Sequence, residues 1–259
     1  MSPLVPLALA LDHAAVTRQA VAQISETQPD FDLTAAYAVQ RLLVQQRLQR
    51  GARRAGLKMG FTSRAKMRQM GVDQMIWGRI TDDMRLDEGA ELALDRYLHP
   101  RAEPEIAFVL KRPLAGRVSA AEAMASVEAV AAGIEIIDSR YRDFRFHLAD
   151  VVADNASSSG FLLGTLHRPD TDVSNLGIAM RVDGRVVQTG SSAAILGHPV
   201  RSLVAAARLA AEAGETLQAG DIVLAGAATE AIALHAGSHV SASFQSLGQV
   251  AFQVSGARS

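Results

Sequence analysis

The stretch HPRAEPEIAFVL, residues 99–110, constrains the fold of this chain more than any other feature of its sequence. Glu103 and Glu105 stand two positions apart and lead directly into an apolar run. In a β-strand, side chains i and i+2 project from the same face, so both carboxylates would point the same way. Like charges side by side in a low dielectric repel and are costly to remove from water. Either a positive group lies between them, or they lie at an exposed strand end.

A third glutamate occurs in a similar setting. Glu135, in AGIEIIDSR, is flanked by isoleucines on a predicted buried strand, where a lone carboxylate needs neutralisation. Glu103 and Glu105 alone would be interpreted as a pair facing water, and the third carboxylate shifts the balance. Three carboxylates in a chain without cysteine suggest a hard divalent cation, Mg²⁺ or Mn²⁺, with positions open for water and substrate oxygens. Such an ion suits a 2-oxo acid, which chelates through its carboxylate and keto oxygens.

Two other stretches carry unexpected polar groups. Lys58, between leucine and methionine in RAGLKMGFTS, is either a strand-end lysine whose ammonium reaches water or a cation beside a metal-bound oxyanion. Asp154, Asn155 and Ser157, in ADNAS, form either a local turn, the favoured interpretation, or part of a pocket for a small polar ligand. The histidines show no metal-ligand spacing. His198 before a helix is expected to be a cap or packing residue, and His147, close to the polar stretch, is a weaker functional candidate.

Composition excludes several classes of protein. With 26 basic and 27 acidic residues the formal net charge is −1, which argues against a nucleic-acid partner. The absence of cysteine excludes disulfides, thiolate metal sites and a cysteine nucleophile, and it fits a cytoplasmic protein. The apolar start of the chain is interrupted by Asp12 and His13, so no membrane span is expected. No phosphate loop, nucleophile elbow or dinucleotide fingerprint occurs, so no nucleotide cofactor is expected.

The pattern along the chain predicts an α+β protein with a helical N-terminal extension over 1–55 and a β-rich catalytic domain over 56–259. Asp183-Gly184 between two apolar segments predicts a tight hairpin. Thr34 is the predicted cap of a helix that ends at Gly51. Strands are expected at 56–60, 103–111, 133–138, 177–182, 185–189 and 221–226, and over the closing stretch 238–254.

Two helices are expected to interrupt the β-rich part. Ser119 with Glu122 forms a predicted capping box for a helix over 120–131. Pro199 opens an alanine-rich helix that Gly214 closes.

Several motifs occur in the order typical of one enzyme family. GLKMGFTSRAKMRQMGV, HPRAEPEIAFVL, IEIIDSRYRDFRF, VVADNASSSGFLLG and SSAAILGHPVRSL resemble the 2-keto-4-pentenoate hydratase and 4-oxalocrotonate decarboxylase family, within the fumarylacetoacetate hydrolase-like superfamily. The resemblance runs from about residue 30 to the C-terminus. It implies the mixed β-sandwich roll of that superfamily, with flanking helices.

The resemblance also implies roles for individual residues. It makes Glu103, Glu105 and Glu135 ligands of Mg²⁺ (or Mn²⁺) and Lys58 an active-site lysine, and it places Ser157 near the substrate carboxylate. These are the same three glutamates that the strand pattern singles out. The implied substrate is a small 2-oxo dicarboxylic acid.

Within the family, SRYRDFRF and GLKMGFTSRAKMRQMGV favour a decarboxylase that converts 2-oxohex-3-enedioate to 2-hydroxypenta-2,4-dienoate and CO₂ in meta-cleavage aromatic catabolism. The ending DDM at Asp82 and Asp83 also occurs in hydratases, so a 2-hydroxypenta-2,4-dienoate hydratase is the alternative. A second alternative is a non-catalytic partner subunit of the pathway complex. Relatives usually assemble, so a homo-oligomer and a complex with the pathway hydratase are both expected.

Overall fold

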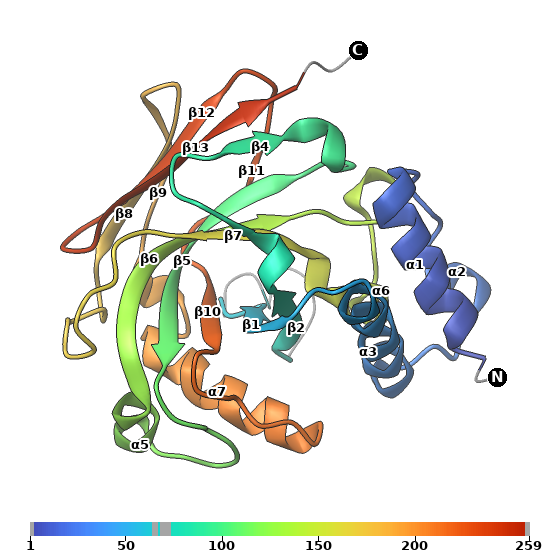
Figure 1. The fold of residues 1–259 in the computed structure, drawn as a ribbon, viewed down its shortest axis with the longest axis horizontal. Coiled ribbons are helices and arrows are strands. Elements are labelled where there is room, and N and C mark those ends of the chain that lie inside the picture. The colour runs from blue at the N-terminus through green and yellow to red at the C-terminus, as the bar shows by residue number, and fades with distance from the viewer. Residues whose placement is uncertain (1–2, 64–66, 68–73, 257–259) are drawn as a thin grey trace.

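The structure, a computed structural model, describes residues 3–63, 67 and 74–256. It contains two β-sheets and two groups of helices (Figure 1). The α+β class predicted from the sequence is confirmed. The helices are α1 (Val5–Thr17), α2 (Ile24–Thr27), α3 (Leu33–Gln49), α5 (Ala120–Ala125), α6 (Leu148–Ala153) and α7 (Pro199–Glu212).

The larger sheet holds the predicted glutamate strands at its centre. Its order is β2-β1-β10-β5-β6-β7-β3, and β11 pairs with β5. β5 lies between β10 and β6, so both of its edges are hydrogen-bonded, and most of its side chains are buried. The strands are β1 (Arg54–Gly60), β2 (Ile76–Thr81), β3 (Arg85–Leu86), β5 (Arg101–Leu110), β6 (Val127–Ile137), β7 (Ser158–Leu163), β10 (Ile222–Ala227) and β11 (Ile232–Ala233).

The smaller sheet has the order β4-β13-β12-β8-β9. The hairpin predicted at Asp183-Gly184 joins β8 to β9, with φ of 50° and 78° at its two residues, as a type I′ turn requires. The closing stretch is a second hairpin, which turns between Phe244 and Gly248. The strands are β4 (Glu91–Ala93), β8 (Gly177–Val182), β9 (Arg185–Ser191), β12 (His239–Phe244) and β13 (Gly248–Ser255).

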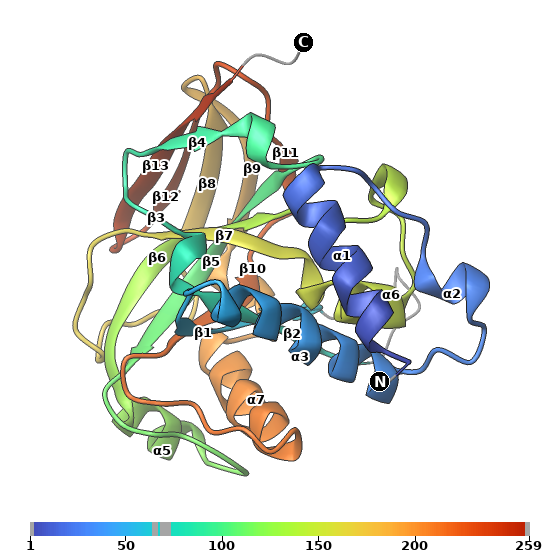
Figure 2. The same cartoon turned by 45° about the vertical axis from the view of Figure 1, so that its right-hand side comes forward.

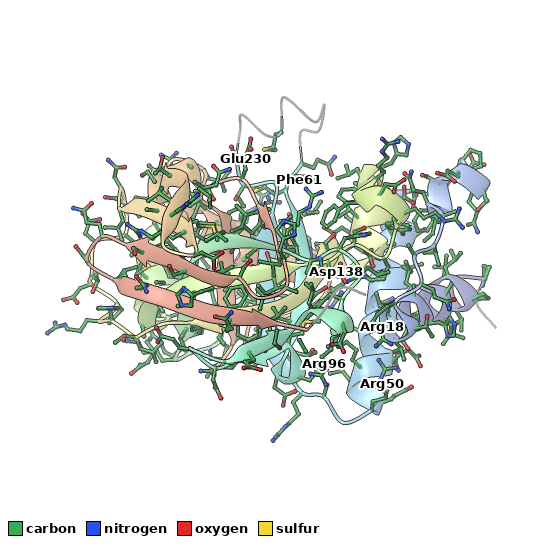
Figure 3. All side chains as sticks on the ribbon, turned by 90° about the horizontal axis from the view of Figure 1, so that it is seen from above. Arg18, Arg50, Phe61, Arg96, Asp138 and Glu230 are labelled. Carbon is green, nitrogen blue, oxygen red and sulfur yellow. The ribbon has the colours of Figure 1, made fainter. Side chains whose placement is uncertain are left out.

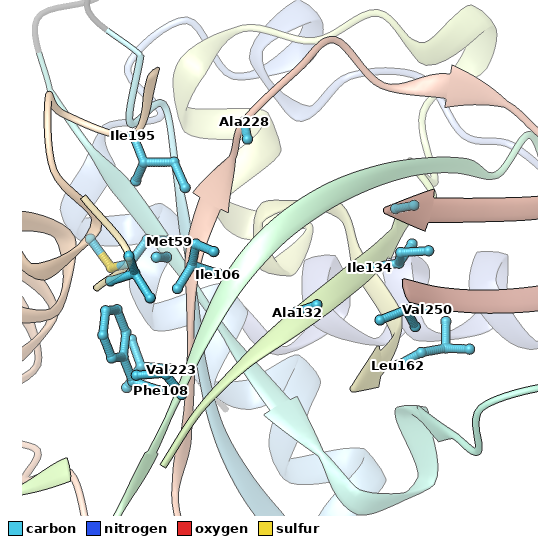
Figure 4. Close-up of a cluster of buried hydrophobic side chains, with 14 of the residues drawn as sticks. Met59, Ile106, Phe108, Ala132, Ile134, Leu162, Ile195, Val223, Ala228 and Val250 are labelled. Atoms are coloured by element: carbon cyan, nitrogen blue, oxygen red, sulfur yellow. The ribbon is translucent and has the colours of Figure 1, made fainter. Parts of the chain in front are cut away.

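A continuous hydrophobic core lies between the two sheets and under α7. Figure 4 shows Val250 of the smaller sheet close to Ile134 and Leu162 of the larger one, while Phe108 and Val223 lie together further along. All five side chains are buried. Burying each contributes about 1.5–3 kcal/mol to folding, so this layer fixes the frame that carries the glutamates.

The N-terminal helices form a separate layer. Figure 2 shows α1, α2 and α3 grouped with α6 on one side of the molecule, away from the smaller sheet. The amide of Gln40, buried on α3, donates to the carbonyls of Trp77 and Val152 and so joins α3 to β2 and α6. The N-terminal helices also share a cluster of buried hydrophobic residues with β2 and α6. The domain boundary at residue 55 stays a prediction.

Local signals in the sequence located some of the helix ends. The capping box of Ser119 and Glu122 is present, and Pro199 opens α7. The cap of α3 is Asp32 and not Thr34, because the Asp32 carboxylate accepts from the Ala35 N–H at 2.8 Å.

The helix expected over 120–131 was wrong in its second half. It ends at Ala125, and β6 begins at Val127. The alanine-rich stretch is compatible with either structure, and its pairing with β5, where Ala129 lies opposite Val109, decides for a strand.

Candidate metal centre and active site

The three glutamates predicted to bind metal lie together. Glu103 and Glu135 are directly opposite each other across the antiparallel pair β5 and β6, and Glu105 follows on the same face of β5. One carboxylate oxygen from each lies within 4.8 Å of the other two. All three side chains are buried. The spacing of two residues in the sequence thus becomes one cluster because the strand register aligns Glu135 with Glu103.

Lys58, on β1, belongs to the same cluster. Its Nζ lies 2.8 Å from Oε2 of Glu135, and its side chain is only 4% exposed. The strand-end interpretation, with an ammonium that reaches water, is therefore wrong. Desolvation alone would lower the pKa of Lys58, but the negative charges of the three glutamates outweigh it and raise the pKa. The side chain is thus a buried cation paired with Glu135.

One ammonium does not neutralise three carboxylates. Burial, followed by the charges of its neighbours, raises the pKa of Glu105 well above its ordinary value. Burial likewise raises the pKa of Glu135 to about 7 despite the opposing effect of Lys58. Oε1 of Glu105 and Oε1 of Glu135 are buried without a hydrogen-bond partner among the described residues. Fully ionised, the cluster carries two negative charges in excess, so its charge and its free oxygens fit a divalent cation.

A β-bulge fixes the orientation of Glu105. The register between β10 and β5 shifts between Leu224 and Ala227. This frees the N–H of Gly226, which donates to Oε2 of Glu105 at 2.7 Å. Gly226 has φ of 105°, and a Cβ there would lie 2.0 Å from Oγ1 of Thr62. Only glycine fits at this position, so the bulge, and with it the hydrogen bond to Glu105, depends on Gly226.

A small cavity of about 130 Å³ opens onto the cluster. Its polar part includes Lys58, Glu103 and Ser157. Figure 3 places Phe61, one of its apolar residues, between the β-sheets and the N-terminal helices. The remaining wall is mostly apolar, so the cavity presents both charged groups and apolar side chains. The apolar lining comprises Phe61, Ile76, Ile137, Phe144, Phe146, Val151, Ala156 and Ala227.

Ser157 lines the cavity, whereas Asp154 forms an ion pair away from it. The Ser157 hydroxyl is buried, has no hydrogen-bond partner among the described residues and lines the cavity. Asp154 forms a buried ion pair with Arg140 and does not line it. Burial raises the pKa of Asp154 to about 6, against the opposing effect of Arg140. The turn interpretation holds for Asp154, whose carbonyl accepts from the Ser157 N–H at 3.0 Å, and the pocket interpretation holds for Ser157.

The two histidines considered from the sequence are helix caps. Nδ1 of His198 accepts from the Val200 N–H at 3.2 Å, which confirms the expectation of a cap. His147 precedes α6, and its N–H donates to the Asp150 carboxylate. Neither lines the cavity.

Comparison with known proteins agrees with this geometry. The family model for the fumarylacetoacetate hydrolase C-terminal domain matches residues 82–255, which is well over half of the chain. The chain belongs to the fumarylacetoacetate hydrolase family. The predicted superfamily fold is confirmed.

Individual relatives within the fumarylacetoacetate hydrolase family cover nearly the whole chain. A 4-oxalocrotonate decarboxylase from a Pseudomonas species is 57% identical over 252 residues, covering 97% of this chain and 98% of that protein. A 2-keto-4-pentenoate hydratase from Burkholderia vietnamiensis is 36% identical, covering 94% of each chain. A solved 4-oxalocrotonate decarboxylase from Pseudomonas putida, complexed with magnesium and adipate, has a TM-score of 0.94 at 35% identity, covering 97% of both chains.

Sequence reasoning missed three parts of this fumarylacetoacetate hydrolase-family site. Gly226 had a detectable signal, because a glycine inside a predicted strand often marks a bulge. Phe61 and Phe146 gave no detectable signal in the sequence, because they reach the cavity from segments far apart along the chain. Asn155 was considered as a turn or pocket residue, whereas its side chain hydrogen-bonds to the backbone of Arg79. Among the described residues, no helix combines the length and apolar character needed to cross a bilayer.

Proposed function

We propose that this chain is a metal-dependent decarboxylase that converts 2-oxohex-3-enedioate to 2-hydroxypenta-2,4-dienoate and CO₂ in meta-cleavage aromatic catabolism. The observation that carries the proposal is the 57% identity to a 4-oxalocrotonate decarboxylase across 97% of the chain. The buried cluster of three carboxylates and one ammonium supplies the chemical basis.

Glu103, Glu105 and Glu135 hold the ion, Mg²⁺ or Mn²⁺. Their free oxygens and excess negative charge are the features of this chain that fit it. When bound, the ion supplies Lewis-acid chemistry, polarising the oxo group of a 2-oxo acid. The Gly226 N–H keeps Glu105 in the orientation needed for binding.

The reaction breaks the C5–C6 bond of the substrate. The bonding electron pair forms a C4–C5 double bond, the C3–C4 electrons move to C2–C3, and negative charge collects on the 2-oxygen. Protonation of that oxygen gives the dienol, and the former C6 carboxylate departs as CO₂. Lys58 supplies positive charge for the developing oxyanion, and no general base is needed to break the bond.

The substrate carboxylates need opposite surroundings. The Ser157 hydroxyl, free and buried at the cavity wall, donates to the C1 carboxylate, which keeps its charge. The C6 carboxylate loses its charge on becoming CO₂, so the apolar residues Phe61, Phe146 and Val151 suit it. Placing a carboxylate against apolar side chains favours the uncharged product over the charged reactant.

The relatives named as hydratases, 36% identical in one case, make a hydratase the second candidate function. The deciding experiment incubates metal-stripped protein with 2-oxohex-3-enedioate, with and without Mg²⁺, and follows CO₂ release and dienol absorbance. Metal-dependent CO₂ release with transient dienol supports the decarboxylase. If no CO₂ forms but added 2-hydroxypenta-2,4-dienoate is consumed, the chain is a hydratase. If neither compound reacts, it is a non-catalytic partner subunit.

Association and location belong to the same proposal. The chain forms a homo-oligomer, binds the hydratase that consumes its product, and works in the cytoplasm, where its lack of cysteine suits a reducing environment. Light scattering of the isolated protein, and of its mixture with that hydratase, tests both forms of association. A monomer mass for the isolated protein contradicts the homo-oligomer, and a mixture in which the two proteins keep their separate masses contradicts the complex.

A further inference from the structure

The turn that carries Ser157 has an unusual backbone. Asn155, Ala156 and Ser157 have φ of 52°, 52° and 59°, so three consecutive residues other than glycine are left-handed. Asparagine tolerates this region, but alanine and serine are disfavoured there because Cβ crowds the following carbonyl. Such a conformation persists only where surrounding contacts impose it.

The Asn155 side chain supplies one of those contacts. Its Oδ1 accepts from the Arg79 N–H at 2.8 Å, and its Nδ2 donates to the Arg79 carbonyl at 2.8 Å. β2 pairs with β1 on its other edge, so the amide occupies the free edge of β2 in place of a neighbouring strand. The backbone of the turn is thereby attached to the larger sheet.

The turn also packs directly on β2. A Cβ at Gly78 would lie 2.4 Å from the backbone oxygen of Asn155. Asn155 is itself only 2% exposed. Close packing and two hydrogen bonds leave the turn little room to relax toward a right-handed conformation.

The far end of the turn is tied to the metal strand. The Asp138 N–H, directly after β6, donates to the Ser157 carbonyl at 2.9 Å. The Ser157 hydroxyl, by contrast, has no partner among the described residues and faces the cavity that Lys58 and Glu103 also line. The backbone of Ser157 is thus held while its hydroxyl is left for a ligand.

We propose that Asn155 is a positioning residue that acts through Ser157. By holding the left-handed turn against β2, it keeps the Ser157 hydroxyl aimed into the cavity, where it meets the carboxylate of a 2-oxo acid. The inference rests on the proposed function for the identity of the ligand. The geometry of the turn is independent of that function.

Amide hydrogen exchange tests the geometry without any ligand. In Asn155→Ala, the amides of Ser157 and Asp138 should exchange at least about tenfold faster, because the turn loses its attachment to β2. Asn155→Ser keeps a small polar side chain that can form one of the two hydrogen bonds, so it should give a smaller increase. The matched control is Asn175→Ala, an exposed asparagine outside the site, which should leave both rates unchanged.

Binding tests the connection to Ser157. The probe is 2-oxohexanedioate with Mg²⁺, a saturated analogue that cannot lose CO₂ through a vinylogous path, measured by calorimetry. Loss of a hydrogen bond to a charged group in Ser157→Ala should weaken binding roughly 10- to 100-fold. Asn155→Ala should show much of this loss. In the Ser157→Ala background, the same change should cost about twofold or less.

Three results would overturn the inference: unchanged exchange at Ser157 and Asp138 in both Asn155 variants, binding losses that simply add, or a loss in Asn155→Ala without one in Ser157→Ala. If Asn155→Ala fails to fold, Asn155→Ser carries the same comparison. If the wild-type protein neither binds 2-oxohexanedioate nor converts 2-oxohex-3-enedioate, the proposed function is refuted and the identity of the ligand that meets Ser157 is withdrawn. The exchange rates then still decide whether Asn155 holds the turn.

Discussion

The ammonium of Lys58 lies 2.8 Å from the carboxylate of Glu135, and both side chains are almost completely removed from water. The two residues come from β1 and β6, which are separated in the sheet by β10 and β5. A buried pair of this kind is costly to assemble and still costlier to break on one side. Its persistence inside an acidic cluster indicates that the charges serve the site and not stability alone.

Removing the cation should damage both stability and chemistry. Lys58→Met keeps the length of the side chain but leaves three buried carboxylates without their ammonium. We expect the metal-free protein to lose about 3–5 kcal/mol in its free energy of unfolding. We also expect kcat to fall about 100- to 1000-fold. Urea unfolding and the CO₂ assay measure the two effects.

The control for this change is Lys111→Met, at an exposed position. It should leave stability within about 0.5 kcal/mol and leave activity unaltered. Normal turnover in Lys58→Met would remove this residue from the mechanism.

Glu135→Gln tests the metal ligands. The amide is nearly isosteric but neutral, so it is a much poorer ligand for a hard cation. Mg²⁺ affinity should fall by at least about 100-fold, the upper range for residues that merely support a ligand. Calorimetric titration with Mg²⁺ measures the change. Glu128→Gln on the same strand, at an exposed position, is the control, and equal affinities in the two variants would contradict the assignment.

Gly226→Ala should disturb Glu105 without changing any charged residue. The new Cβ would meet Oγ1 of Thr62, so the backbone must shift, and the N–H that binds Glu105 shifts with it. We expect weaker Mg²⁺ binding and a lower melting temperature. Gly220→Ala separates clash from backbone strain, because its φ is also positive, at 87°, but its Cβ would meet nothing within 4 Å. It should lower the melting temperature and leave Mg²⁺ affinity intact.

The stabilising effect of Mg²⁺ should grow with pH. The pKa of Glu135 in the metal-free fold is raised to about 7, so folding favours its protonated form. Its contribution to stability is complete below the pKa of the unfolded chain and is lost as the pH rises through about 7. Mg²⁺ binds the ionised carboxylate, so at low pH it must displace a proton.

The measurement is the shift in melting temperature between saturating Mg²⁺ and a chelator, at about pH 5.5 and about pH 8.5. The shift should be clearly larger at the higher pH. An equal shift at both values would mean that the carboxylates bind metal without losing a proton, against the raised pKa of Glu135.

Most signals confined to a few residues were read correctly from the sequence; the cap expected at Thr34 was wrong, because Asp32 caps α3. Asp183-Gly184 gave the hairpin, Ser119 with Glu122 gave a helix start, and Pro199 gave another. Each depends on a backbone dihedral or a hydrogen bond within four residues, so tertiary contacts have little influence on it. The error over 120–131 arose where local preference was weak and pairing with β5 decided the outcome.

The sequence by itself determined which groups were available: three glutamates in apolar segments, one lysine between apolar residues and no thiol. A buried carboxylate needs a positive group or a metal ion nearby, and the sequence alone predicts this need. Only the tertiary structure decided which groups neutralise the carboxylates. The register that sets Glu103 opposite Glu135, the bulge at Gly226 and the turn at Asn155 all depend on contacts between distant segments. No local pattern encodes such contacts, because they exist only after the sheet has formed.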